Sequence, residues 1–218
     1  MYLLAGRTIL YHKLQLSSTI RMYAKSAVTI ANILEAAASL FLTRNFADVT
    51  MSDIADAAEV TKGALYHHFD SKEDLYLSMM HAYLEEIKGL MATVVAADGS
   101  CRRRLRHFTL TFLQLPPEKQ ALMQLVRRDA NIFEGAERRR LVRAYQAALP
   151  EQAEKIIKDG IDNGEIIGVD ARLLSWEHVA SVEVVMADYA RERLGGPEAT
   201  ADFVMELFFD GVARDDGN

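Results

Sequence analysis

Residues 50–75 constrain the fold of this chain more than any other stretch of its sequence. Thr50 suits the N-cap of a short helix, and Asp53, three residues later, completes a capping-box pattern. Thr61 offers a second cap, and Leu65 begins the buried face of the helix that follows. Two short helices joined by a tight turn are typical of a helix-turn-helix, whose second helix enters the major groove of DNA.

From Ile54 to Leu75 the sequence resembles the DNA-binding region of the TetR family of bacterial transcriptional regulators. The matching positions read Ile-Ala-x-x-Ala-x-Val-x-x-Gly-x-Leu-Tyr-x-His-Phe-x-x-Lys-x-x-Leu. Glu59 departs from the pattern, because it stands at the turn where the family usually has Gly. Gly tolerates a positive φ, so Glu59 must either adopt a left-handed conformation at a cost or shift the turn.

The resemblance implies DNA contacts at the positions that match. Thr50 and Thr61, at the starts of the two short helices, correspond to residues that bind phosphate through the free amides of a helix N-terminus. Others correspond to phosphate contacts (Tyr66, His68, Lys72) or to positions that face the bases (Lys62, Ala64, His67). The predicted DNA-binding residues are Thr50, Thr61, Lys62, Gly63, Ala64, Tyr66, His67, His68 and Lys72. His68 has a second, compatible interpretation, as a core-edge residue that packs beside Phe69.

The composition favours an all-α fold of about nine helices. Half of the 218 residues are hydrophobic, and only 4 Pro and 12 Gly interrupt them. We expect a basic extension over residues 1–25, a three-helix DNA-binding domain over 26–72, and an effector-binding and dimerisation domain over 73–218. Apolar periodicity and turn residues predict helices over 27–45, 71–97, 100–115, 118–133, 136–163 (split near Pro150), 170–194 and 197–213, besides the two short ones.

The charge is distributed unevenly between these segments. The net charge is −6, yet residues 1–72 carry seven Lys and Arg against six Asp and Glu, and the remainder carries 18 against 25. Local basic charge on an acidic body fits a DNA-binding head. Residues 1–25 contain four basic residues and no acid. A partly ordered extension of little function is the preferred interpretation, ahead of a DNA-touching arm, an extra packed helix, or translation upstream of the usual start.

The resemblance also implies a small-molecule effector bound among the helices of the second domain. The candidate lining residues are Met80, Tyr83, Leu84, Phe108, Phe112, Met123, Phe133, Tyr145 and Trp176. The helical spacing by itself favours an ordinary hydrophobic core for any single one of these residues, and it is the resemblance that favours a pocket. If a pocket is present, its apolar lining suggests a hydrophobic or aromatic ligand.

In the family the last two helices pair with their copies in a four-helix dimer interface. The helices expected over 170–194 and 197–213 are apolar over a wide arc, which suits burial against both the chain itself and a partner. A homodimer on a palindromic operator is therefore expected. A charged residue in place of Phe208 should then break the dimer.

Other classes of function find little support in the sequence. The six histidines have no metal-ligand spacing, and no nucleophile elbow, phosphate loop or carboxylate pair is present, so we predict no metal, no cofactor and no enzymatic activity. We expect that no apolar run approaches the ~18 residues of a membrane span, and therefore expect no membrane partner. Cys101 is the sole cysteine, which agrees with a reducing cytoplasm. Its place at an Arg-rich helix start would favour a reactive thiolate, although a passive side chain is the preferred interpretation.

We therefore expect a cytoplasmic regulator of the TetR type, and more specifically a repressor that a small molecule releases from DNA. Two alternatives belong to other classes. A helical interaction or scaffold protein would keep the two-helix hairpin without binding DNA specifically. An enzyme with a fused DNA-binding head would require a set of catalytic residues that the sequence does not show.

Overall fold

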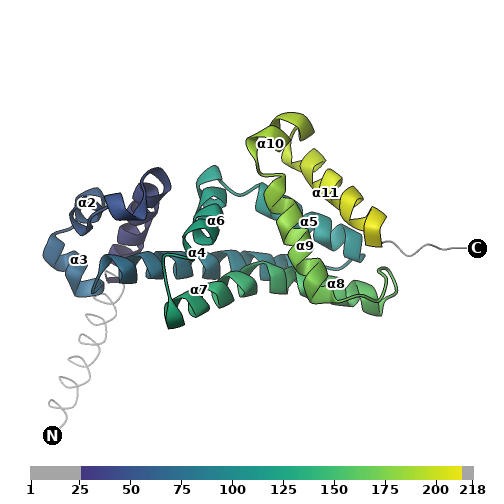
Figure 1. Ribbon diagram of the computed structural model, residues 1–218, viewed down its shortest axis with the longest axis horizontal. Helices are drawn as coiled ribbons and strands as arrows, with labels where there is room; N and C mark the ends of the chain where they lie inside the picture. Colours follow the sequence, from purple (N-terminus) through teal and green to yellow (C-terminus); the bar gives the residue numbers. More distant parts are fainter. Residues whose placement is uncertain (1–25, 213–218) are drawn as a thin grey trace, which may run out of the picture. The chain divides into compact units, whose positions relative to one another are not determined.

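The computed structural model describes residues 26–212, with side chains through residue 209 (Figure 1). The predicted basic extension over residues 1–25 lies outside them. Within this range every regular element is helical, with eleven α-helices and one 3-10 turn and no strand. This confirms the all-α class and exceeds the nine helices expected.

A helix over residues 26–43 opens the described chain. The elements that follow are η1 (Phe46–Asp48), α2 (Met51–Ala57), α3 (Lys62–His68), α4 (Lys72–Val95), α5 (Cys101–Leu113), α6 (Pro117–Asp129), α7 (Gly135–Ala148), α8 (Pro150–Asp162), α9 (Ala171–Val184), α10 (Asp188–Leu194) and α11 (Pro197–Val212).

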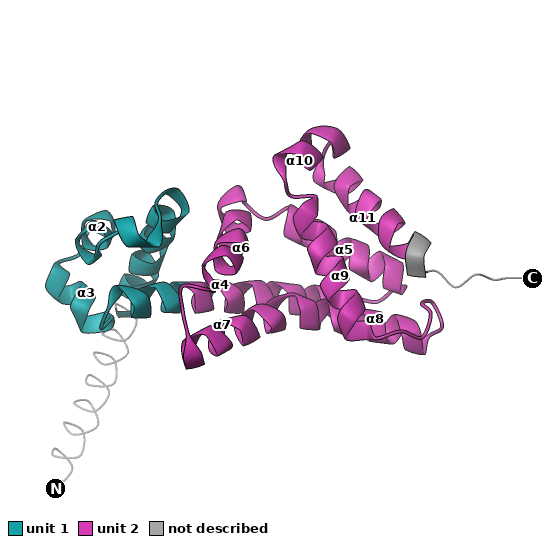
Figure 2. Cartoon of the chain, viewed as in Figure 1, with its two compact units in different colours: residues 1–79 teal, residues 80–218 magenta. Residues whose placement is uncertain are grey.

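The chain divides into two compact units, residues 1–79 and residues 80–218 (Figure 2). The border falls inside α4, which runs without interruption from Lys72 to Val95. The first turns of α4 therefore belong to the unit that holds α2 and α3, and the rest of α4 belongs to the second unit.

The core of the first unit forms around three aromatic rings. Phe41 and Tyr76 are at most 1% exposed and meet edge to face, with ring centroids 4.5 Å apart. Phe46 stacks on Phe41 at 5.8 Å and meets Tyr76 at 5.0 Å. Ile33 and Ala37, spaced four residues apart on the first helix, complete this buried face.

The first helix also has the length and composition of a membrane span. Ser26–Thr43 has a mean hydropathy of 1.5, and 17% of it is buried. This corrects our expectation that no apolar run approaches that length. A helix that contributes to a protein core meets the same criteria, and the burial of Ile33, Ala37 and Phe41 gives this helix such a role.

In the second unit, α8 packs against α9, α5 and α7, and α5 also packs against α11. Gly160 on α8 lies directly against Cys101 at the start of α5. A Cβ atom on Gly160 would lie 2.7 Å from both the Cβ and the Sγ of Cys101, which is well inside van der Waals contact. Gly160 is therefore required by this helix crossing, because any larger residue would force the two helices apart.

One predicted break in the second unit is confirmed and another was missed. Pro150 separates α7 from α8 as expected, since proline cannot continue the hydrogen bonding of the preceding helix. The helix predicted over 170–194 is wrong, because α9 ends at Val184 and α10 begins at Asp188. Between them the amides of Met186 and Ala187 bond to carbonyls three residues back, which tightens the chain into a turn. Burial of Val185 and Met186 stabilises this turn. Its sequence contains no Gly or Pro from which the turn could have been predicted.

Candidate nucleic-acid interface

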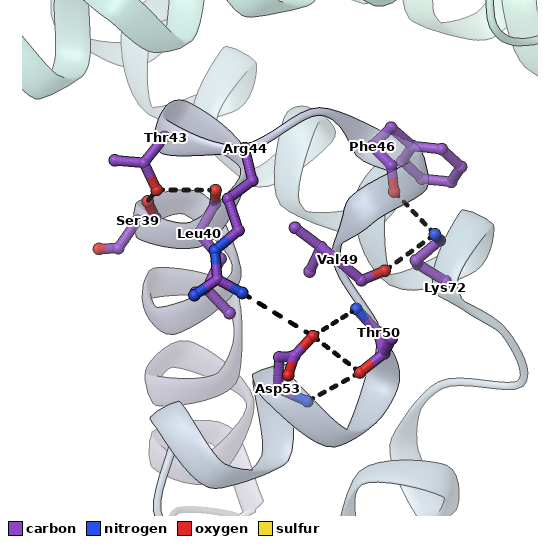
Figure 3. A network of polar contacts seen from close by, with 9 residues as sticks. All are labelled: Ser39, Leu40, Thr43, Arg44, Phe46, Val49, Thr50, Asp53 and Lys72. Atoms are coloured by element: carbon purple, nitrogen blue, oxygen red, sulfur yellow. Dashed lines mark hydrogen bonds and ion pairs between the residues drawn. The ribbon is translucent and has the colours of Figure 1, made fainter.

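The start of α2 is fixed by a complete capping box (Figure 3). The Thr50 hydroxyl accepts a hydrogen bond from the Asp53 amide at 3.1 Å, and the Asp53 carboxylate accepts from the Thr50 amide at 2.9 Å. The Thr50 hydroxyl also donates to the same carboxylate at 2.8 Å. The bond from the Thr50 amide is the main reason that the pKa of Asp53 lies below its usual value. The predicted cap is confirmed.

The turn between α2 and α3 keeps a left-handed residue. Glu59 has φ 54°, and it is the single non-glycine residue with a positive φ in the described chain. The Val60 amide closes the turn by bonding to the Ala55 carbonyl at 3.0 Å. Of the two outcomes open to Glu59, the structure adopts the strained conformation rather than a shifted turn, at a cost of roughly 1–2 kcal/mol.

Helix α3 presents one buried face and one open face. Thr61 caps it by accepting from the Ala64 amide at 3.1 Å, and Leu65 is fully buried against the rest of the unit. Tyr66 is 53% exposed. The exposed residues of the capped helix start and the outer face are Thr61, Lys62, Gly63, Tyr66 and His67.

Gly63 stands in open space on this outer face. A Cβ atom there would meet only the Thr61 hydroxyl oxygen, at 4.0 Å. Packing within the protein therefore does not require glycine at this position. Ala64 and His68 flank the outer face and are half-buried, so His68 lies at the edge of the core as well as near the surface.

Two of the predicted phosphate-binding residues use their polar atoms inside the unit. The hydroxyl and the amide of Thr50 are both hydrogen-bonded to Asp53 in the capping box. The Lys72 ammonium donates to the carbonyl oxygens of Phe46, at 2.7 Å, and of Val49, at 2.9 Å. An open hollow of about 400 Å³ lies beside them and is lined by Ala47, Val49, Thr50, Met51, Ser52, Lys62, Tyr66 and Lys72.

Arg44 is a member of this network that the sequence did not reveal. Its guanidinium lies 3.9 Å from the Asp53 carboxylate, at the end of the first helix (Figure 3). The acceptors of Lys72 were equally hidden, because they are backbone carbonyls and no side-chain pattern marks them.

Most of the candidate effector-pocket residues lie in the interior of the second unit. Those that are at most 6% exposed are Met80, Tyr83, Leu84, Phe108, Phe112, Met123 and Phe133. The hydroxyl of Tyr83 donates to the Lys119 carbonyl, and burial raises the pKa of this phenol. Tyr145 is half-buried, and its hydroxyl donates to Glu183 at 2.7 Å.

Trp176 and Phe208 occupy environments opposite to those we expected. Trp176 is 44% exposed on α9, with the Arg172 guanidinium 5.6 Å from its ring, so it does not line the interior. Phe208 is only 3% exposed and packs edge to face against His178, at 5.4 Å, and Phe209, at 5.2 Å. Phe208 is therefore a core residue of the protomer and does not lie on a free face.

Cys101 has the properties of an inert side chain. It is 1% exposed, and burial raises the pKa of its thiol to about 12, with a further contribution from the Glu165 carboxylate. Glu165 also accepts the Cys101 amide at 2.8 Å, so the free amide of the helix start is already used. The thiolate interpretation is wrong. Within residues 26–212 no group of three or more His, Cys, Asp or Glu is placed to hold a metal ion.

Two capped short helices, a tight turn and an open face on the second helix form a helix-turn-helix, the arrangement in which the second helix of many DNA-binding proteins enters the major groove. Residues 33–79 match the sequence model described as bacterial regulatory proteins, tetR family. The matched residues include α2, the turn and α3.

Curated relatives resemble the chain mainly in its N-terminal part. It is 38% identical over 79 residues to the transcriptional repressor KstR2 of Rhodococcus jostii, a match that covers 36% of this chain and 39% of that protein. It is 42% identical over 81 residues to the regulator TtgR of Pseudomonas putida, covering 35% and 39%. The chain thus matches about two fifths of the length of each of these relatives.

The likeness to solved structures extends over the whole fold. The regulator FadR of Bacillus subtilis, solved in complex with stearoyl-CoA, aligns with a TM-score of 0.72 at 20% identity and covers 83% of this chain and 98% of that one. PfmR of Thermus thermophilus aligns with a TM-score of 0.68 at 21% identity, covering 84% and 99%. At these identities the alignments establish the fold.

Proposed function

We propose that the chain is a cytoplasmic transcriptional repressor that binds a palindromic operator as a homodimer and leaves it when a small apolar effector binds. Residues 26–72 would form the DNA-binding domain, and residues 73–218 the effector-binding and dimerisation domain. The observation that carries the proposal is the outer face of α3, where a basic, an aromatic and an imidazole side chain stand exposed beside a glycine that nothing in the protein crowds. Relatives that are bacterial regulators support the cytoplasmic location.

The side chains of this face suit the edges of bases and the phosphates beside them. Lys62 is the first residue of α3 and can donate to O6 and N7 of guanine, while the Ala64 methyl can contact thymine. Tyr66 and His67 can donate to phosphates or to base edges. The open space at Gly63 would let the DNA approach the helix backbone closely.

The proposal is tested first by a mobility-shift assay on the chain's own upstream region, together with duplexes selected from a randomised pool. Specific binding is expected at low and at moderate salt. If no duplex is preferred over bulk DNA even at low salt, the chain is a helical scaffold protein that keeps the hairpin.

Replacing Lys62 by Ala is expected to weaken binding to the selected operator by ~1–3 kcal/mol and to relax discrimination at one base position. The measurement is the affinity for the operator and for each single-base variant of it. Lys88→Ala is the matched control, because Lys88 belongs to the second unit and pairs with Glu85, three residues before it on α4. Equal loss of affinity for every variant would assign Lys62 to phosphate contact instead.

Exposed apolar stripes on α9 and α11 support a dimer. On each helix the exposed apolar residues recur at a helical spacing, so they share one face. They are Leu173 (62% exposed), Trp176 (44%) and Val184 (70%) on α9, and Phe203 (42%) and Leu207 (57%) on α11. A partner that covers them with its own copies would give a twofold interface, and a twofold protein reads a palindromic site.

A long-chain acyl-CoA is the first effector to test. The apolar interior of the second unit suits the acyl chain of this ligand, although not its charged CoA head group, which would stay outside that interior. A protein of the same fold was solved with stearoyl-CoA bound. Saturating stearoyl-CoA is expected to weaken operator binding by about 5–150-fold, the range typical of allosteric coupling. Operator should weaken stearoyl-CoA binding by the same factor, because linkage is reciprocal. Stearoyl-CoA that binds without changing operator affinity would contradict a ligand switch of this kind.

A further inference from the structure

Lys72 is the first residue of α4, and its ammonium contacts three groups of the first unit: two backbone carbonyls and one aromatic ring. Its ammonium donates to the carbonyl oxygens of Phe46, at 2.7 Å, and of Val49, at 2.9 Å (Figure 3). The same nitrogen stands 4.3 Å from the centroid of the Phe46 ring, which places its charge over an aromatic face. The side chain is half-buried, so these contacts are partly shielded from water.

The two carbonyls that Lys72 binds belong to the segment that leads into α2. Phe46 is the first residue of η1, and Val49 is the residue at its end. Val49 is fully buried, and the next residue, Thr50, is the N-cap of α2. Lys72 therefore ties the start of α4 to the residues that fix where α2 begins.

A second set of contacts holds the same point from the side of the first helix. Asp53 closes the capping box with Thr50, and its carboxylate lies 3.9 Å from the Arg44 guanidinium. The N-terminus of α2 is thus held between the end of the first helix and the start of α4. Since α2 packs against α3, the position of this N-terminus also sets that of the outer face of α3.

We propose that Lys72 is a positioning residue for DNA binding, which holds the helix-turn-helix in place through the carbonyls of Phe46 and Val49 instead of contacting a phosphate. This inference rests on the proposed function of α3 as the DNA-binding helix. Two of the three ammonium protons point at carbonyls in the free protein. A move to a phosphate would leave two partly buried carbonyls without this donor, and the loss of hydrogen bonds to a charged group is costly.

The two roles differ in how operator binding responds to salt. A lysine that neutralises a phosphate releases counterions, so its removal lowers the slope of log affinity against log salt by about 0.9. A positioning lysine neutralises no phosphate, and its removal weakens binding at every salt concentration without changing the slope. Binding should also weaken equally for all sequences, because no base contact is lost directly.

The test compares Lys72→Met with Lys62→Met in the full-length protein. Methionine keeps most of the aliphatic stem and removes the ammonium in both cases. Lys62 is exposed on the outer face of α3 and is the matched lysine whose charge faces the DNA in the proposed function. The probe is a duplex that the wild-type protein selects from a randomised pool, and affinities are measured at 10 °C, where every variant is shown by circular dichroism to be folded.

For Lys72→Met we expect operator binding about tenfold weaker, equivalent to ~1.4 kcal/mol, with an unchanged salt slope. Amide hydrogen exchange should become faster over residues 46–53 and stay the same in the second unit, and Tm should fall by about 2–8 °C. For Lys62→Met discrimination at one base position should relax, with no change in exchange or Tm.

Three results would overturn the inference. A salt slope lowered by about 0.9 in Lys72→Met would make it a phosphate contact. Unchanged exchange over residues 46–53 would show that the two carbonyl bonds do not hold the segment. Faster exchange with unchanged operator affinity in the folded variant would leave Lys72 a stabilising residue with no part in DNA binding. Failure of the proposed function is distinguishable, since the wild-type protein would then select no duplex, while the exchange result on Lys72→Met would stand.

Discussion

Leu207→Glu is expected to give a folded monomer whose operator affinity is about 10²–10⁴-fold lower than that of the wild type. Leu207 is 57% exposed on α11, so a carboxylate costs little in the isolated protomer but would be buried in the proposed interface. Two half-sites about one helical turn apart require two linked heads, and the loss of the link removes the avidity that they share. Ultracentrifugation gives the oligomeric state, and titration of the full operator gives the affinity.

Val142→Glu is the matched control for this variant. Val142 is an exposed apolar residue of the same unit and belongs to α7, not to α9 or α11. It should remain dimeric and bind the operator normally. If Leu207→Glu were monomeric yet bound the full operator as tightly as the wild type, the dimer would not be needed for recognition, and if it stayed dimeric the interface would lie elsewhere.

At the next position, Phe208→Ala is expected to lower the free energy of unfolding by ~3–5 kcal/mol. Phe208 is 3% exposed and fills the space between the rings of His178 and Phe209, so its truncation leaves a cavity in the core. Urea unfolding should be followed in the Leu207→Glu background, so that dissociation does not add to the measured change. A different result would place Phe208 in the dimer interface instead. Phe208→Ala would then leave the free energy of unfolding unchanged, and the same substitution in a protein that keeps Leu207 would abolish the dimer.

The local parts of the candidate interface were predictable because their signals are local. Thr50 and Asp53 form a capping box within four residues of sequence. Pro150 ends the preceding helix because its ring lacks the amide hydrogen that the helix needs. The left-handed turn was predictable as one of two outcomes, since a single residue, Glu59, carries the conflict. In each case the residues that cause the structure lie within four residues of one another in the chain.

The parts that escaped prediction depend on residues far apart in the sequence. Lys72 finds its acceptors 23 and 26 residues away, on backbone atoms that carry no side-chain signal. Leu207 and Phe208 are adjacent and similarly apolar, and a helix that is apolar over a wide arc does not reveal which side meets its own core. The turn after Val184 forms because Val185 and Met186 are buried there, a tertiary effect that leaves no mark of Gly or Pro.

The contact between Gly160 and Cys101 gives the protein a built-in chemical reporter of its own opening. Cys101 is the sole thiol of the chain, and it packs against Gly160 on α8, where no side chain would fit. A disulfide reagent has no room to reach the sulfur while α5 and α8 stay packed, and the pKa of about 12 leaves almost no thiolate to attack it. The rate of thiol labelling in the folded protein therefore measures how often these two helices separate, and the slowing of that rate by a bound molecule would measure how strongly the molecule holds the second unit closed.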